Sequence, residues 1–371
     1  MRKVLQKGGR IANCLPGLFV CLALVCGTTG AGEEYVIKYS HLGVPDAMMQ
    51  SSSAKAVVFK AELEKLSGGR IKVDIYASGR LAGLQSSVVQ VRKGTIEIAD
   101  ISSGVLASLY YPPLEILDLP YLFSSRATAR MALDNEQPVI RKLIEDCAKR
   151  TGVRILSLGP FGFRHMTNNI RAIRTPEDMK GLKMRTMEIV PHMKLMESLG
   201  ATPVPIGWLE LYTSLQTNVV DGEETTLQNI VMGKLYQVQK HLTLTGHLMG
   251  VGAFLCNEKW YRSLPEDLRE ALIEAEMTAR LTYDGFGELL DTVALGELKK
   301  PEKRMEIYSP TAEQMKMFRQ AARPYVMNWM KERPWVQEES YRGLVEEFLA
   351  SIEAVEEKLR QEAESAETTQ N

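Results

Sequence analysis

The chain has few of the residues on which several protein classes depend. Glycine (28 of 371 residues) and proline (16) are too scarce for a collagen-like or low-complexity protein. The 45 basic side chains are balanced by 46 acidic ones, so the basic excess typical of a protein that binds nucleic acid is absent. The remaining composition is that of an ordinary globular protein, long enough for one large domain or two modest ones.

Histidine and cysteine number five each, and their spacing gives no metal or catalytic motif. No two histidines stand four residues apart, as metal ligands on a helix do. The GxSxG nucleophile elbow, the phosphate-binding GxxxxGK[ST] loop and a GxGxxG turn after a strand are also missing. Cys147 and Cys256 either form a disulfide or remain as buried thiols. We therefore expect no metal, no cofactor and no enzymatic activity.

Long hydrophobic runs are missing too, because the most apolar segment, residues 14–26, has only about 13 residues against the roughly 20 needed to span a bilayer. Four basic residues and no acidic ones precede it, and small residues follow it. This order predicts a secretory signal peptide over residues 1–31, cleaved near Ala31, with a retained membrane anchor as the alternative. The rest of the chain then has 41 basic and 46 acidic side chains and no predicted membrane span, as expected of an acidic protein exported to the periplasm.

Strand and helix patterns alternate after the signal peptide. The predicted order is strand, helix, strand, helix, strand, and it indicates an α/β fold with a largely parallel sheet. The pattern starts again further along the chain, which predicts two α/β lobes. The expected strands are residues 35–40, 70–76, 96–101, 154–158 and 181–185, and the expected helices of the first lobe are 48–67 and 86–93.

The C-terminal part of the sequence is mostly helical. Few residues that break a helix occur between 264 and 300, so one long helix is expected there, with Gly285 and Gly287 as a point where it bends. The acidic end of the chain is expected to form a frayed tail over residues 361–371.

Two arginines stand near the ends of predicted strands. Arg164 follows the strand at 154–158, and Arg185 closes the strand at 181–185. In open α/β sheets ligands bind beyond the carboxyl ends of strands, and a guanidinium offers a planar pair of donors that matches a carboxylate. The alternative for each arginine is a salt bridge at the surface.

Three stretches carry a resemblance to a known family: Lys180–Arg185 (KGLKMR), Leu199–Pro205 (LGATPVP) and Glu210–Glu224 (ELYTSLQTNVVDGEE). Together with Ser67–Val73 (SGGRIKV) and Leu117–Phe123 (LDLPYLF), they resemble the periplasmic solute-binding subunit of TRAP transporters, the DctP-like family. The resemblance covers about residues 35–345.

The resemblance implies a two-lobe periplasmic binding protein fold, with a ligand cleft between the lobes and a long helix that spans the hinge. Lobe 1 is expected over 33–160 plus 250–290, and lobe 2 over 161–249 plus 291–360. The family captures an organic acid anion by closing the cleft and passes it to a separate TRAP permease, which is driven by an ion gradient. Most members are monomers.

The resemblance also assigns roles to residues of the second lobe. Arg185 is expected to pair bidentately with the ligand carboxylate, and Arg164 is expected to give the ligand a second contact. Trp208 is expected to pack against the ligand, or else to be a core aromatic. Thr225 stands where the family often has an asparagine that contacts the ligand. Glu224 and Tyr212 are expected behind these residues, with Glu224 bracing Arg185.

In the first lobe, strand ends suggest His41 and Ser103 as ligand contacts. Some family members carry an acidic residue in the segment that corresponds to 79–85, and this chain does not. That difference favours a less polar or less cationic ligand, and it disfavours a pocket of the sialic-acid or ectoine type. Four-carbon dicarboxylates, sugar acids, 2-keto acids and aromatic acids all remain open, as do service to a sensor instead of a transporter and an exported enzyme on the same scaffold.

Overall fold

A computed structural model describes residues 34–370 of the chain, with side chains described through residue 365. The predicted signal peptide at 1–31 lies outside the described residues. The nine strands of the described chain are β1 (Tyr35–His41), β2 (Ile71–Tyr76), β3 (Ile98–Ser102), β4 (Val153–Asn168), β5 (Lys183–Thr186), β6 (Thr202–Pro205), β7 (Gly222–Thr226), β8 (His241–Asn257) and β9 (Glu306–Tyr308).

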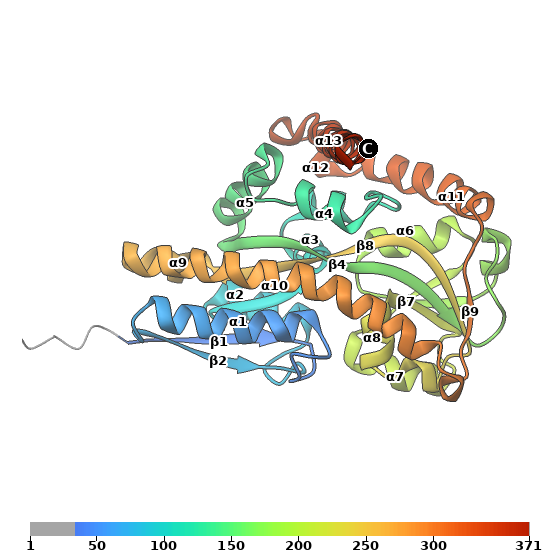
Figure 1. Cartoon of the computed structure of the whole chain (residues 1–371), viewed down its shortest axis with the longest axis horizontal. Helices are drawn as coiled ribbons and strands as arrows, with labels where there is room; N and C mark the ends of the chain where they lie inside the picture. Colours follow the sequence, from blue (N-terminus) through green and yellow to red (C-terminus); the bar gives the residue numbers. More distant parts are fainter. Residues whose placement is uncertain (1–33, 371) are drawn as a thin grey trace, which may run out of the picture. The chain divides into compact units, whose positions relative to one another are not determined.

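Helices connect and cover these strands (Figure 1). They are α1 (Ser51–Leu66), α2 (Leu84–Lys93), α3 (Ser103–Leu109), α4 (Arg126–Ala132), α5 (Pro138–Thr151), α6 (Val190–Ser198), α7 (Trp208–Gln216), α8 (Leu227–Met232), α9 (Glu258–Ser263), α10 (Glu266–Leu298), α11 (Ala312–Lys331), α12 (Pro334–Gln337) and α13 (Leu344–Gln370). Short 3₁₀ turns lie at Pro112–Asp118, Pro176–Met179, Leu235–Gln237, Pro301–Lys303 and Glu339–Tyr341.

The strands form one sheet in the order β2-β1-β3-β8-β4-β7-β5-β6, with β9 paired to β8. The βαβ units give parallel pairs at both ends, β1 with β2 and β3, and β5 with β6 and β7. The middle is antiparallel, because β8 runs against both β3 and β4, and β4 against β7. The expectation of a largely parallel sheet is therefore wrong at the centre, where two long strands pair with each other.

Strands β4 and β8 join the two halves of the fold. Their pairing has three register shifts, at Ile155/Ser157, Pro160/Gly162 and Arg164/Met166. Such shifts bend a strand without ending it. The sequence pattern predicts a strand that stops at residue 158, but β4 continues to Asn168, because glycine and proline at 159–162 interrupt the apolar pattern while the backbone stays extended.

Helix α10 crosses the whole sheet and contacts α1, β4 and α8 (Figure 1). It is one uninterrupted helix of 33 residues, so the predicted long helix is confirmed, and it continues through Gly285 and Gly287. In the last third of the helix, Asp291 pairs with Arg126, which also donates to the carbonyl oxygens of Pro160 (2.7 Å) and Phe161 (3.3 Å). Arg126 thus links the point where β4 passes from one half of the fold to the other, which is called the crossover below, to the helix that spans both halves.

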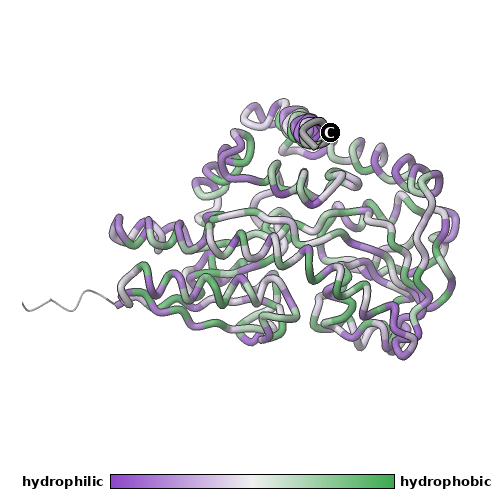
Figure 2. Tube along the Cα trace, in the orientation of Figure 1, coloured by the Kyte–Doolittle hydropathy of each residue, from purple (hydrophilic) through white to green (hydrophobic). Residues whose placement is uncertain are grey.

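The buried apolar side chains form separate clusters. One packs α1 and β1 to β3 against the first half of α10, around Phe59 and Phe254. Another packs α7 and α8 against the last turns of α10. The largest extends beneath α4 to α6 and α11 to α13. Hydrophilic and hydrophobic residues alternate along outer helices such as α5 and α11 (Figure 2), as expected of helices that bury one side.

Three sequence expectations concern the rest of the described chain. Helix α13 runs through Gln370, so the segment expected to be a frayed tail is helical, with contacts such as Gln361 to Glu357 along its surface. Cys147 and Cys256 are both buried free thiols. No helix within the described residues is long and apolar enough to cross a membrane.

Candidate functional site

A cavity lies between the two halves of the sheet, next to the crossover of β4 and β8. It encloses about 730 Å³ of space, part of which is open to solvent. Its apolar wall includes Leu42, Leu84, Ile101, Phe161, Met187 and Trp208, and its polar residues include Gln50, Asp100, Arg164, Arg185, Thr225 and Asn229.

Arg185 is a buried cation without an ion-pair partner among the described residues. Its side chain is 2 % exposed and lines the cavity. It makes one hydrogen bond within the described chain, from Nε to the carbonyl oxygen of Ile206 (2.8 Å). Burial lowers the pKa of this guanidinium to about 10, although the charges of Glu223 and Glu224 oppose the shift. The group remains charged at neutral pH, and its Nη atoms are left for another acceptor.

Arg164 lines the same cavity but is already paired. Its Nε lies 2.5 Å from Oε2 of Glu224, and its Nη2 donates to Oε1 (2.9 Å) and to the Glu224 carbonyl (2.6 Å). The pairing follows from the sheet, because Arg164 on β4 lies beside β7, which carries Glu224. The expectation that Glu224 braces Arg185 is therefore wrong in its partner: Glu224 holds Arg164.

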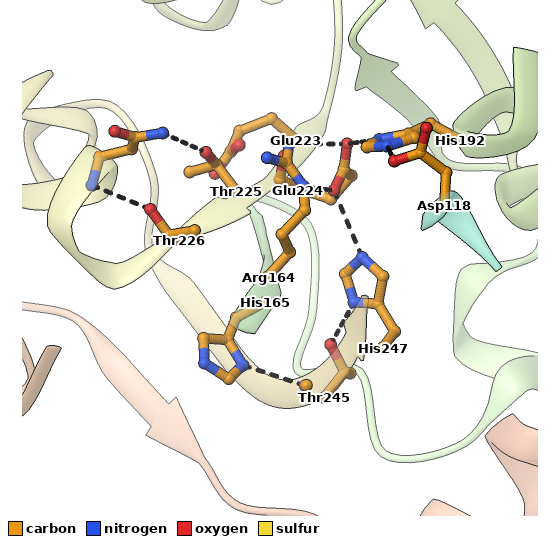
Figure 3. Close-up of polar contacts among 12 residues, drawn as sticks. Asp118, Arg164, His165, His192, Glu223, Glu224, Thr225, Thr226, Thr245 and His247 are labelled. Atoms are coloured by element: carbon orange, nitrogen blue, oxygen red, sulfur yellow. Dashed lines mark hydrogen bonds and ion pairs between the residues drawn. The ribbon is translucent and has the colours of Figure 1, made fainter. Parts of the chain in front are cut away.

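Glu224 is the centre of a buried polar network (Figure 3). Its Oε1 lies 3.0 Å from Nδ1 of His192, whose Nε2 is 3.3 Å from Asp118, and its Oε2 lies 3.3 Å from Nε2 of His247. Burial alone would raise the pKa of Glu224, but Arg164 and His192 hold it well below its usual range. Burial also disfavours a charge on His192, yet Glu224 and Asp118 raise its pKa overall. The network thus keeps a carboxylate charged without contact with solvent.

Glu223 has a different environment from its neighbour. Its Oε1 accepts a hydrogen bond from the hydroxyl of Thr167 (2.8 Å), and its Oε2 has no partner in the described part of the chain. Burial raises its pKa to about 7, although Arg185 opposes this shift. Adjacent glutamates of one strand therefore differ, because one faces a guanidinium at bonding distance and the other does not.

Two further predicted contacts, Trp208 and Thr225, do line the cavity. Trp208 is the first residue of α7, and its ring packs so close to Gly233 that a Cβ there would lie 3.1 Å from it. Thr225 is buried, and its Oγ1 accepts a hydrogen bond from Nδ2 of Asn229 (3.0 Å). Asn229, four residues further along the chain on α8, carries a side-chain amide that also lines the cavity.

Three predicted residues lie away from the cavity. His41 shares the core-facing side of β1 with Ile37 and Tyr39, and its ring packs against Tyr39 at a centroid distance of 5.8 Å. Ser103 begins α3 and is fully buried, because β3 ends one residue later than expected; Ser102, its neighbour, lines the cavity. Tyr212 donates its hydroxyl to Gln237 (3.1 Å), near the surface.

Sequence reasoning missed Gln50, Asp100 and Asn229. Asp100 lies within β3, where the pattern suggests only a buried strand, and a charged residue inside such a run was the available signal. Gln50 and Asn229 are ordinary polar residues in the sequence, and only the fold brings them together, with Gln50 Nε2 3.3 Å from Asn229 Oδ1. In the described part of the chain, no group of three or more histidine, cysteine, aspartate or glutamate side chains is placed to hold a metal ion.

Comparison with known proteins identifies the family. The model of bacterial extracellular solute-binding protein family 7, DctP, matches residues 45–333. A solute-binding protein of Verminephrobacter eiseniae is 40% identical over 217 residues, which are 58% of this chain and 64% of that protein, less than two thirds of its length. The C4-dicarboxylate-binding periplasmic protein DctP of Rhodobacter capsulatus is 28% identical over 324 residues, 87% of this chain and 94% of that one.

Solved structures agree with this result. A TRAP periplasmic solute-binding protein of Polaromonas, solved with D-erythronate, has a TM-score of 0.77 and 28% identity, and the match covers 86% of this chain and 99% of that one. These relatives are binding proteins and not enzymes, and their fold has two lobes. The chain belongs to bacterial extracellular solute-binding protein family 7, the family of the TRAP solute-binding proteins.

Proposed function

We propose that this protein binds a small organic acid anion in the cavity and delivers it to a TRAP permease for uptake driven by an ion gradient. The observation that supports this most directly is Arg185, a buried guanidinium that lines the cavity and has no ion pair within the described residues. A buried charge is costly unless it is paired, and a ligand carboxylate provides the pair. Arg164 contributes a second positive edge, although Glu224 already neutralises most of its charge.

Contacts across the cavity support a mechanism in which the lobes close on the ligand. The N-terminal end of α1 reaches α8 through Gln50 and Asn229 (3.3 Å) and through the Ser51 hydroxyl and Oε1 of Gln228 (3.4 Å). Such direct bonds form only when the two halves are close together. A ligand that touches both halves shifts the population toward this closed arrangement, and no covalent step is needed.

The relatives indicate the class of ligand. The Rhodobacter protein is named for C4-dicarboxylates, and the Polaromonas protein was solved with D-erythronate, so both ligands are small carboxylates. From the same family we also propose the periplasmic location, the monomeric state and the lobe boundaries, and from the pattern of the first residues we propose cleavage near Ala31. Service to a sensor is the remaining alternative for the partner.

A thermal-shift screen of the chain from residue 32 against small organic acids tests the binding step. A ligand at about 100 times its Kd should stabilise the folded state by roughly 2.7 kcal/mol. Stabilisation by at least one acid is the expected result, and stabilisation by none would overturn the proposal. For the partner, a strain without this gene should lose uptake of the identified acid; intact uptake with a lost transcriptional response would favour a sensor.

A further inference from the structure

The cavity wall in the first lobe carries two buried acceptors without partners. Asp100, on β3, is 7 % exposed and lines the cavity; the Tyr39 hydroxyl lies near its carboxyl group, but Oδ2 accepts no well-formed hydrogen bond among the described residues. Gln50 is 4 % exposed and also lines the cavity; its Nε2 is used by Asn229, and its Oε1 has no partner in the same part of the chain. Buried acceptors are normally satisfied, so two of them at one cavity indicate where a donor belongs.

The charge at this wall is negative and faces the cavity. Asp100 is the only acidic side chain among the described residues that line it. The nearby cation, Lys55, does not line the cavity; its Nζ lies 3.8 Å from Glu276 and 4.0 Å from the ring centre of Phe254. Burial raises the pKa of Asp100 to about 6, while the charge of Lys55 and the nearby Tyr39 hydroxyl oppose the shift.

The two lobes therefore offer the ligand opposite poles. Lobe 2 presents the donors of Arg185 on β5, and lobe 1 presents the acceptors of Asp100 on β3, with β8, β4 and β7 between them in the sheet. A molecule that satisfies both has an anion at one end and a hydrogen-bond donor at the other. A second carboxylate would meet the like charge of Asp100, and a methyl group would leave both acceptors unpaired.

We propose that the ligand is a monocarboxylic acid with a hydroxyl or ammonium group remote from its carboxylate, bound by Asp100 and Gln50, and that dicarboxylates are disfavoured. This inference rests on the proposed function, because it takes the carboxylate at Arg185 as given. It departs from the expectation of a less polar or less cationic ligand, because Asp100 on β3 would supply the acid that segment 79–85 lacks.

A matched set of ligands tests the inference on the wild-type chain from residue 32. The set varies the chain length, which is four, five or six carbons, and the terminal group opposite the carboxylate, which is a methyl, a hydroxyl, an ammonium or a second carboxylate. The four-carbon members are butyrate, 4-hydroxybutyrate, 4-aminobutyrate and succinate. We expect calorimetry to show the hydroxyl or the ammonium compound binding at least tenfold more tightly than the methyl and carboxylate compounds of equal length. The hydroxyl and ammonium compounds distinguish the two kinds of donor.

The near-isosteric variant Asp100→Asn identifies the residue responsible. In this variant, the ratio of the affinity for the hydroxyl or ammonium compound to the affinity for the dicarboxylate should fall by at least tenfold. The affinity for the ammonium compound should fall most, because the amide keeps an acceptor but loses the charge. Asp74→Asn, at an exposed position of β2, should leave all affinities unchanged. A dicarboxylate that binds the wild type as tightly as the donor-bearing acids would overturn the inference, whether or not Asp100→Asn folds.

Failure of this inference differs from failure of the proposed function. If dicarboxylates bind best and Arg185→Ala abolishes that binding, the carboxylate site stands and the assignment of Asp100 is wrong. If no acid of any kind binds the wild type, the proposed function itself is wrong.

Discussion

The Glu224 carboxylate makes two hydrogen bonds along one edge of the Arg164 guanidinium, with Nε 2.5 Å from Oε2 and Nη2 2.9 Å from Oε1. This pair leaves Arg164 with little net charge to offer a ligand. Arg185 lines the same cavity without such a pair in the described chain, so the two arginines that sequence reasoning treated together have different roles. Arg164 is fixed by the protein, whereas the Nη atoms of Arg185 have no acceptor within the described residues.

Arg185→Ala should lose affinity for the identified acid by about 2–5 kcal/mol, because truncating one partner of a buried charged pair leaves the other unpaired. The affinity of Arg185→Lys should lie between those of the wild type and Arg185→Ala, since lysine keeps the charge but not the planar pair of donors. Isothermal titration calorimetry measures both. Arg141→Ala, at an exposed arginine on α5, should bind as the wild type does. Near-wild-type affinity in Arg185→Ala would show that the carboxylate binds elsewhere.

Glu224→Gln should destabilise the protein by about 3–5 kcal/mol, because it removes the charge that compensates the buried Arg164. Glu223→Gln is the matched control one residue away, with a group that is partly protonated at pH 7. Urea denaturation at pH 7 should show a much smaller loss for this variant. Equal losses in the two variants would contradict the distinct environments of these carboxylates.

The pH dependence separates the two variants further. The pKa of Glu223 is raised from 4.5 to about 7 in the folded protein, so its contribution to stability is present below pH 4.5 and is lost as the pH rises through 7. Glu223→Gln should therefore gain stability relative to the wild type over this range. Glu224 has a lowered pKa, so its contribution is present above pH 4.5 and is lost in acid.

Of the contacts predicted from the sequence, those of the second lobe line the cavity and those of the first lobe do not. Arg185 lies in a family motif and Trp208 lies between two of them, at a strand end and a helix start whose positions the chain fixes locally. Asp100 lies inside a strand, and its value as a cavity residue depends on β8 and α10, which come more than 140 residues later. His41 was misplaced because a strand end has two faces, and the alternation with Tyr39 puts it on the core side.

The same limit applied to the sheet. Apolar alternation located β1 to β3 within two residues or so, since that signal is local. The antiparallel pairing of β4 with β8 joins residues as far apart as Val153 and Asn257, and no local pattern specifies it. The partner of Arg164 follows from that pairing and could not be inferred without it.

Trp208 should report ligand binding by fluorescence. Its ring lines the cavity at the start of α7, so a bound ligand changes its surroundings, whereas Trp335 is packed in a core cluster. Titration with the identified acid should change the emission of the wild type, and Trp208→Phe should lose most of that change. Trp335→Phe should keep it. An unchanged signal in Trp208→Phe would place the ligand away from this ring.

The contact between Gln50 and Asn229 should contribute to affinity through lobe closure. Gln50→Ala and Asn229→Ala are each expected to bind the acid several-fold more weakly than the wild type. The loss of affinity in the double variant should be smaller than the product of the two single losses, because both substitutions remove the same hydrogen bond. Calorimetry on the four proteins gives the coupling energy, expected at about 0.5–1.5 kcal/mol. Strictly additive losses would mean that the two side chains act on the ligand separately. Urea denaturation of the same proteins without ligand checks that stability is not the cause.

His41 should make the protein less stable in mild acid. Burial lowers its pKa from 6.5 to about 4, so its contribution to stability is present above pH 6.5 and is lost as the pH falls toward 4. That difference corresponds to about 3 kcal/mol by pH 4. His41→Phe and His41→Leu have no proton to bind there, and their stability should fall less than that of the wild type between pH 7 and pH 4. Urea denaturation across this range measures the slopes, and parallel slopes in all three proteins would show that His41 titrates normally.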